Sequence, residues 1–441
     1  MKNRKQELGK KWKEVFPNNV SKGWRNFVEN WYIENATPGL YTLDIEHIPD
    51  ELVSKHNDPA SGENIASRYR VDLCPHKCPF CFNEDSDIYG LEKGSGEKKR
   101  RNKVMTLEDT FRVIDEAKKI ASTEGHDFRN VKFLGPGELL LNTQLFQILD
   151  GYKLRDVGIG IFTKGAVLGD DTLAQKHHGM TAKELTDKLA GYDNVSLIFS
   201  FQSFDYDLQD SLVTSKSDNG IIGLQGYSKI RERAIDNLFG SSFYKNGTTH
   251  RVAMINAPII PENIGESFDI YEFFIKRGTP VIMTPSMVSG KGCGQLERQT
   301  KQININEWFS KLVELYAKVY DFNVRMRIQT EEEIKREGIS CYTGNSPCNQ
   351  ASTGMYVRAN GYVQMCPGRF DKETFFGDLE DASLREIWNK SPNKKRGISN
   401  PHNLVNNRCP AKDGYAFPEG FYDKVMDKYL ELRRLNDART N

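Results

Sequence analysis

The chain has 441 residues, with 61 Lys and Arg against 60 Asp and Glu, for a formal net charge of +1 at pH 7. This near-neutral balance argues against a strongly basic nucleic-acid surface, and the absence of any run of 18 apolar residues predicts no membrane-spanning helix. The charged start of the chain lacks the apolar core of a signal peptide, so we expect a cytoplasmic protein whose 8 cysteines serve metal or redox chemistry rather than disulfides.

Residues 1–64 form a charged N-terminal segment in which Trp12, Trp24 and Trp31 are interleaved, and the sequence assigns this segment no role. Residues 11–16 are expected to form a short basic amphipathic helix packed on the exterior of the neighbouring domain. Binding of a peptide or another partner by this helix is the alternative interpretation.

Residues 67–73 alternate between apolar and polar side chains, which predicts a half-buried strand leading into a cysteine-rich loop. Cys74, Cys78 and Cys81 follow at C-x3-C-x2-C spacing, so one tight loop can direct all three sulfurs at one point. A closed zinc site, or a 4Fe–4S cluster that only carries electrons, takes four thiolates, whereas three thiolates leave one iron open to a substrate or cofactor. A zinc loop completed by His76 or a distant cysteine, or a chance cluster, is the alternative.

Strand and helix patterns then repeat along the chain. Thr106 and Asp109 resemble a capping box that opens a helix reaching about Ile120. Further strands are predicted at 131–134, 157–162, 195–201, 249–255 and 280–284, and further helices at 143–149, 182–189, 228–238, 268–276 and 306–319. Strands that alternate with helices imply right-handed crossovers in a parallel sheet. We therefore expect an α/β fold whose six units form a partial (β/α)6 TIM-like barrel over residues 65–325.

Polar and glycine-containing motifs follow successive predicted strands. In parallel α/β folds the chemistry lies at the carboxyl ends of the strands. Glycine lets the backbone approach a ligand closely, and a carboxylate can pair with an ammonium group. Ordinary glycine turns are the alternative. The candidate positions are Gly135, Gly137 and Glu138 after the second strand, Thr163 after the third, and Ser200 and Gln202 after the fourth.

A different pattern begins near residue 330. Asn360 and Gly361 stand between two alternating apolar runs, which predicts a β-hairpin that ends at Cys366. A short helix is expected at 383–388, and an amphipathic helix at 418–436 closes the region. The other cysteines of this region are Cys341, Cys348 and Cys409.

The cysteine spacing at 74–81, with Phe80 before its last cysteine, resembles the signature of the radical S-adenosylmethionine (AdoMet) enzymes. Residues 377–388, which begin Gly-Asp-Leu and end Leu-Arg-Glu-Ile-Trp, resemble the SPASM and twitch extensions of that family, and the resemblance covers about residues 67–410. It implies a 4Fe–4S cluster whose open iron binds the amino and carboxylate groups of AdoMet. Pro136 between the two glycines, and Lys164 where the family has Asn, depart from the family pattern. The implied cluster ligands are Cys74, Cys78 and Cys81, and the implied AdoMet contacts are Phe80, Gly135, Gly137, Glu138, Thr163, Ser200 and Gln202.

The resemblance also implies that residues 326–441 form a SPASM/twitch-like domain with one auxiliary iron–sulfur cluster of the 4Fe–4S type. Its implied ligands are Cys341, Cys348, Cys366 and Cys409, and a four-cysteine zinc site is the alternative. Cys293 remains outside both sets, in a glycine-rich loop after the sixth strand. It either fills a tight turn as a small residue or donates a hydrogen atom to a substrate radical.

With this resemblance, the sequence predicts an iron–sulfur oxidoreductase that cleaves AdoMet to a 5′-deoxyadenosyl radical and abstracts hydrogen from a substrate. A flavodoxin- or ferredoxin-type reductant is expected to supply the electron. Oxidative modification of a peptide or protein side chain is the preferred outcome. A small-molecule or sugar dehydrogenase, or an epimerase that uses Cys293, is an alternative enzyme. A non-catalytic iron–sulfur or zinc electron-transfer scaffold is the alternative of another class, and the neutral charge disfavours RNA modification.

Overall fold

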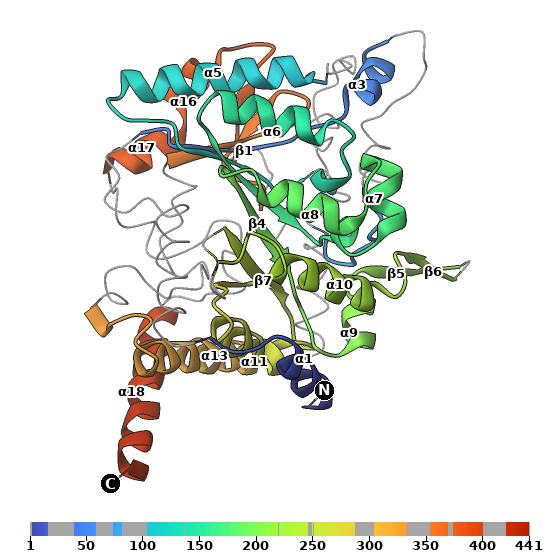
Figure 1. The fold of residues 1–441 in the computed structure, drawn as a ribbon. Helices are drawn as coiled ribbons and strands as arrows, with labels where there is room; N and C mark the ends of the chain where they lie inside the picture. Colours follow the sequence, from blue (N-terminus) through green and yellow to red (C-terminus); the bar gives the residue numbers. More distant parts are fainter. Residues whose placement is uncertain are drawn as a thin grey trace.

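A nine-stranded, mostly parallel sheet organises the part of the chain that the computed structural model describes (Figure 1). The described residues are 2–15, 39–58, 74–81, 104–135, 137–218, 220–245, 249, 251–286, 304–332, 353–368, 374–399 and 420–440. The strand order is β11-β10-β9-β1-β2-β3-β4-β7-β8. The strands are β1 (Thr42–Ile45), β2 (Asn130–Phe133), β3 (Gly158–Thr163), β4 (Val195–Ser200), β7 (Val252–Ile259), β8 (Val281–Pro285), β9 (Gly354–Val357), β10 (Tyr362–Gln364) and β11 (Phe375–Asp378).

The neighbouring strands β1, β2, β3, β4, β7 and β8 are all parallel, and helices connect them. The helices of this region are α3 (Asp50–Asn57), α5 (Leu107–Thr123), α6 (Leu145–Leu154), α7 (Asp171–His178), α8 (Ala182–Ala190), α9 (Tyr206–Ser211), α10 (Tyr227–Phe239), α11 (Ile264–Ile275) and α13 (Ile305–Arg325). The predicted α/β class and partial barrel are confirmed, and α5 begins at the expected capping box, with Thr106 as its N-cap. Helices α3, α7 and α9 are additions that the sequence did not indicate.

The first parallel strand lies earlier in the chain than expected. Strand β1 comes from the N-terminal segment at Thr42–Ile45, whereas the strand predicted at 67–73 lies outside the described residues. β1 pairs in parallel with β2 on one side and with β9 on the other, and Leu43 lies opposite both Val131 and Met355. A segment that was assigned no role therefore joins the barrel strands to the C-terminal hairpin.

The two faces of β1 and β2 differ sharply in chemistry. Leu43 and Val131 belong to the main hydrophobic core together with side chains of α5 and α6. The alternate positions point to the opposite face of the sheet. There, Thr42 Oγ1 donates to Asn130 Oδ1 at 2.8 Å, and Lys132 Nζ lies 3.2 Å from Asp44 Oδ1. These four polar side chains lie on one face of the sheet, and the apolar core packs on the other.

The helix expected at 11–16 is wrong. Helix α1 instead spans Lys2–Lys11 and ends where the predicted helix was to begin. Trp12 is buried just after its end, its Nε1 donates to Asp236 Oδ1 at 2.8 Å, and Val15 N donates to the carbonyl of Lys276 at 2.8 Å. These tertiary contacts hold residues 12–15 out of the helix. The expected packing on the barrel exterior is confirmed, because Trp12 packs against Phe239 and Phe274.

The predicted hairpin at the C-terminal side is confirmed. β9 and β10 are antiparallel around Asn360 and Gly361, and Gly361 has a φ of 84°, the left-handed region that favours glycine. Helix α16 (Leu384–Lys390) then begins at a Ser383–Glu386 capping box and is followed by α17 (Pro392–Ser399). Helix α18 (Phe421–Thr440) packs on α13, where the Tyr316 and Phe421 rings lie 6.0 Å apart.

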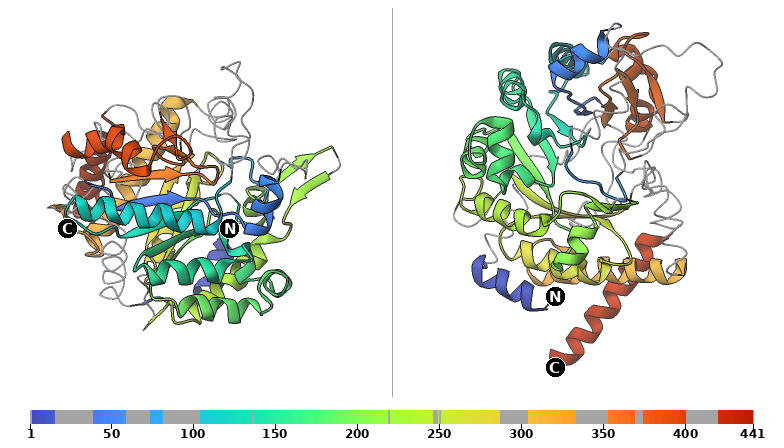
Figure 2. Two further views of the ribbon diagram at one scale, coloured as in Figure 1. Left: turned by 90° about the horizontal axis from the view of Figure 1, so that it is seen from above. Right: turned by 90° about the vertical axis from the view of Figure 1, so that its right-hand side faces the viewer.

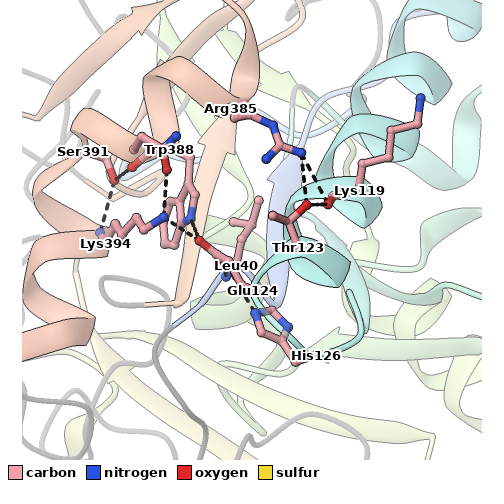
Figure 3. Close-up of polar contacts among 10 residues, drawn as sticks. Leu40, Lys119, Thr123, Glu124, His126, Arg385, Trp388, Ser391 and Lys394 are labelled. Carbon is pink, nitrogen blue, oxygen red and sulfur yellow. Dashed lines mark hydrogen bonds and ion pairs between the residues drawn. The ribbon is translucent and has the colours of Figure 1, made fainter.

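A carboxylate at the end of α5 joins α16 and α17 to the barrel (Figure 3). Glu124 Oε1 accepts from Trp388 Nε1 at 2.9 Å and from Lys394 Nζ at 2.6 Å. Its Oε2 accepts from the backbone N–H of Leu40 at 3.0 Å, just before β1. One side chain thus connects the segment before β1, the end of α5, and the pair of helices α16 and α17. No helix in the described ranges is long and apolar enough to cross a membrane.

Candidate functional site

The cysteine-rich loop at residues 74–81 packs against α10 and against residues that follow β3 and α9. Cys78 is buried and forms a small apolar cluster with Ala166, Val213, Tyr227 and Ile230, and Phe80 and Cys81 pack partly buried on the same group. The backbone N–H of Lys77 donates to the carbonyl of Val213 at 2.8 Å. The loop is therefore held by residues that follow β3 and β4, at the carboxyl end of the parallel strands.

The three thiols of this loop share one environment with a carboxylate. Burial raises the pKa of the Cys74 thiol, and the nearby Cys78, Glu138 and Cys81 groups raise that pKa further. Within the described ranges, no three His, Cys, Asp or Glu side chains are placed to hold a single metal ion. Three thiols on one loop are nevertheless the donor set of an iron–sulfur cluster, so the chemistry of these side chains fits the cluster that the family resemblance implies.

Glu138 and Thr163, which were predicted separately after two different strands, are in direct contact. Thr163 Oγ1 donates to Glu138 Oε1 at 2.6 Å, and the backbone N–H of Lys164 donates to Oε2 at 3.0 Å. The parallel register of β2 and β3, which places Phe133 opposite Ile161, brings the two strand ends together. Burial raises the pKa of Glu138, although these hydrogen bonds oppose the rise. The carboxylate is thus oriented before any ligand arrives.

The glycines beside these residues have structural reasons to be glycine. Gly137 has a φ of 71°, and Gly165 a φ of 64°. A Cβ atom built on Gly165 would lie 2.0 Å from the ring of Phe199, so no larger residue fits there. The N–H of Gly165 donates to Thr163 Oγ1 at 2.7 Å, which fixes the hydroxyl that holds Glu138. Gly135 is buried at the end of β2.

His76 of the cysteine loop and Tyr227 of α10 form a buried pair. Their rings meet edge to face with centroids 4.9 Å apart, and Tyr227 donates its hydroxyl hydrogen to the carbonyl of Lys164 at 2.7 Å. Burial, and then the charges of Lys164 and Lys77, lower the pKa of His76 well below its usual value. Neither ring nitrogen of His76 has a hydrogen-bond partner among the described residues. Tyr227 could not be identified from the sequence, because nothing marks a tyrosine in the first turn of a helix as part of a site.

Ser200 and Gln202 lie at the end of β4, as expected, but in different environments. Ser200 is half-buried. Gln202 is fully buried, its Nε2 donates to the carbonyl of Ala257 at 2.9 Å, and its Oε1 accepts from Gln209 Nε2 at 2.8 Å. The polar atoms of Gln202 are therefore engaged within the protein, where they tie β4 to β7. That either residue contacts AdoMet stays a prediction.

Of the predicted auxiliary ligands, Cys366 lies within the described residues. It lies two residues after the end of β10, and its carbonyl accepts from Gln364 Nε2 at 2.9 Å. The positions outside the described residues are Cys293, Cys341, Cys348 and Cys409.

Comparisons with known proteins agree with this architecture. A family model described as SPASM, an iron–sulfur cluster-binding domain, matches residues 348–411. The structure of native anSMEcpe with bound AdoMet has a TM-score of 0.51 at 13% sequence identity, covering 91% of this chain and 99% of that chain. A histidine-tagged form of anSMEcpe with bound AdoMet has a TM-score of 0.50 at 14% identity, over 92% and 96% of the two chains.

Streptococcus suis SuiB bound to S-adenosylmethionine has a TM-score of 0.45 at 16% identity, over 85% of this chain and 71% of that chain. No curated protein sequence matches this chain. The chain therefore carries a SPASM domain and shares the fold of the anSMEcpe structures. The SPASM match includes Cys348, Cys366 and Cys409, whereas Cys341 precedes it.

Proposed function

We propose that this SPASM-domain protein is a radical AdoMet enzyme that oxidises a side chain of a peptide or protein. The observation that carries the proposal is the arrangement of the 74–81 loop, where three thiols share one environment with the oriented carboxylate of Glu138. A non-catalytic scaffold has no need of a carboxylate fixed beside an incomplete set of thiols. The family resemblance of the C-x3-C-x2-C spacing gives this arrangement its chemistry.

The residues of the loop and the strand ends have distinct roles. Cys74, Cys78 and Cys81 would hold the cluster, and three thiolates would leave one iron for AdoMet. Glu138 accepts a hydrogen bond from the amino group of AdoMet, because its position is already set by Thr163 and by the N–H of Lys164. When bound, cluster and AdoMet together supply a 5′-deoxyadenosyl radical that removes hydrogen from the substrate.

The SPASM domain supports oxidation of the substrate as the net reaction. Residues 348–411 match an iron–sulfur cluster-binding domain, and its hairpin joins the barrel sheet directly through the β9–β1 pair. Cys341, Cys348, Cys366 and Cys409 would hold an auxiliary 4Fe–4S cluster, which would supply an acceptor for one electron from the substrate. Removal of a hydrogen atom and then an electron is a net oxidation of the substrate.

Anaerobic reconstitution with iron and sulfide tests the proposal. With dithionite as reductant, the wild-type protein should release 5′-deoxyadenosine from AdoMet. Replacing Cys74, Cys78 and Cys81 together by Ala should abolish this release and lower the iron content from about eight to about four per chain. Cys293→Ala, outside both ligand sets, serves as the matched cysteine control and should keep both clusters. Undiminished 5′-deoxyadenosine production in the triple variant, or zinc in place of iron, would overturn the proposal.

A further inference from the structure

A projecting hairpin connects the cysteine loop to the surface of the molecule. β5 (Thr214–Ser217) and β6 (Gly220–Gly223) pair antiparallel, and Figures 1 and 2 show this hairpin extending away from the body of the protein. Ile221 is 56% exposed and Ile222 is 45% exposed. Successive side chains of a strand point to opposite faces, so each face of β6 presents an isoleucine. Neighbouring exposed apolar residues on a projecting element are typical of an interaction site.

The base of the hairpin is hydrogen-bonded to Lys77, the residue before Cys78 in the cysteine loop. Ser215, which pairs with Ile222 across the hairpin, donates its hydroxyl hydrogen to the carbonyl of Lys77 at 2.5 Å. The N–H of Lys77 donates to Val213, directly before β5, at 2.8 Å. Lys77 is covalently joined to Cys78. Ile222 is therefore linked to Cys78 through its pairing with Ser215, the hydrogen bond from Ser215 to Lys77, and the peptide bond between Lys77 and Cys78.

Close packing reinforces this connection. Gly223 has a φ of 105°, and a Cβ atom built there would lie 3.2 Å from the backbone nitrogen of Lys77. The end of β6 therefore lies directly against the cysteine loop. A protein that binds the hairpin therefore contacts an element that packs directly on the cysteine loop.

The hairpin and its surroundings carry several lysines together with carboxylates, among them the exposed Asp207 of α9. Lys216 lies directly opposite Ile221 and is exposed, Lys229 is exposed in the first turn of α10, and Lys164 is half-buried beside the site. Among the described hairpin residues the carboxylate is that of Asp218. On the adjacent α9, Asp210 is engaged by the backbone N–H and hydroxyl of Ser228, both at 2.7 Å. Exposed isoleucines with Lys216 and Lys229 beside them complement a partner whose surface is apolar at its centre and acidic at its rim.

We infer that the β5–β6 hairpin is the docking element for a small acidic electron-transfer protein that reduces the cluster at Cys74, Cys78 and Cys81. The inference rests on the proposed function, which requires an external one-electron reductant. In the docked complex the donor loses one electron and the cluster gains it, with no group or proton transferred. The partner encloses the end of the hairpin, and both isoleucines are then buried.

Steady-state AdoMet cleavage with two reductants tests this inference. The variant carries Ile221→Ser and Ile222→Ser together, and the matched control is Leu154→Ser, because Leu154 is 86% exposed on α6. With reduced flavodoxin as the electron donor, the double variant should need at least about tenfold more flavodoxin for half-maximal 5′-deoxyadenosine release, since apolar residues at the centre of an interface contribute strongly to affinity. With dithionite, a small reductant that needs no docking, wild type, double variant and control should all react alike.

A charge variant adds an independent measurement. Lys216→Glu should weaken the flavodoxin-driven reaction, and added salt should weaken it in the wild type more than in this variant. Equal flavodoxin dependence in wild type and double variant would overturn the inference. A double variant that loses iron and the dithionite reaction would also overturn the inference, because the hairpin would then only support the loop. So would a double variant in which only the oligomeric state or the substrate affinity changes. A wild-type protein that cleaves AdoMet with neither reductant contradicts the proposed function instead.

Discussion

Glu124 is expected to be a main anchor of the SPASM helices on the barrel, and replacing it by Gln tests this. Its side chain is 14% exposed and lies at the end of α5, where it accepts hydrogen bonds from Leu40 N, Trp388 Nε1 and Lys394 Nζ (Figure 3). Glutamine has the same shape but only one accepting oxygen. Whichever way the amide is turned, its NH2 group faces at least one of these donors.

The geometry sets the size of the effect. If the amide nitrogen takes the place of Oε2, the N–H of Leu40 is left without its acceptor, which costs about 1–3 kcal/mol at a buried position. The ion pair with Lys394, whose side chain is 24% exposed, loses its charge, and such partly exposed pairs contribute about 1 kcal/mol or less. We therefore expect Glu124→Gln to lower the free energy of unfolding by about 1–4 kcal/mol.

The pH dependence gives a second signature. Burial alone would raise the pKa of Glu124, but hydrogen bonds from Lys394, Trp388 and Leu40 together lower it. A carboxyl whose pKa is lower in the folded than in the unfolded protein stabilises the fold fully above its unfolded pKa of about 4.3, and this stabilisation is lost as the pH falls through the folded pKa. The stability difference between wild type and Glu124→Gln should therefore begin to shrink as the pH falls through about 4.3.

Urea unfolding of the anaerobic holoprotein, followed by tryptophan fluorescence at pH 7 and at pH 4, measures both effects. Glu51→Gln is the matched control, because Glu51 is an exposed glutamate in the first turn of α3. If Glu124→Gln and Glu51→Gln have the same urea midpoint at pH 7, the assignment of Glu124 as an anchor is refuted. A stability loss at pH 7 that persists unchanged at pH 4 would show that shape rather than charge is responsible.

Three further predictions concern the clusters and the substrate. Thr163→Val removes the hydroxyl that holds Glu138 and should weaken AdoMet binding about tenfold at unchanged iron content; Thr163→Ser should restore it, and equally tight binding by the valine variant would argue against a role for Glu138. Cys366→Ala should lose about four irons per chain while substrate-free AdoMet cleavage persists, and zinc at this site in anaerobically purified protein would contradict the electron-accepting role. Cys293→Ala should retain activity if the enzyme is an oxidase, whereas incorporation of deuterium from D2O into the reacting carbon, lost in this variant, would identify an epimerase.

Periodicity and strand order carried much of the prediction. The runs at 157–162 and 195–201 became β3 and β4, because apolar residues buried on both sides of a parallel sheet leave a clear pattern. Glu138 and Thr163 were predicted separately after two successive strands, and they meet because adjacent parallel strands end at one edge of the sheet. Turn chemistry was equally informative, as the Asn360–Gly361 hairpin shows.

Side chains that act through tertiary contacts could not be predicted in this way. β1 was missed because it is four residues long and two of them, Thr42 and Asp44, are polar but buried. Gln202 was placed correctly, yet the sequence does not reveal that its amide is engaged by Gln209 and Ala257. Glu124 looks like any glutamate at the end of a helix, because its partners come from segments far away in the chain.

The position of β1 has a consequence for how the protein folds and how it can be divided. Thr42–Ile45 is made early, but its partner on one side, Gly354–Val357, comes far later in the chain, so on a ribosome one edge of β1 waits without a partner. Unpaired strand edges rich in buried apolar residues are prone to aggregate. A fragment cut at residue 325 keeps the whole barrel yet leaves the edge at Leu43 and Ile45 open. We expect such a fragment to be insoluble unless the missing strand is supplied in trans.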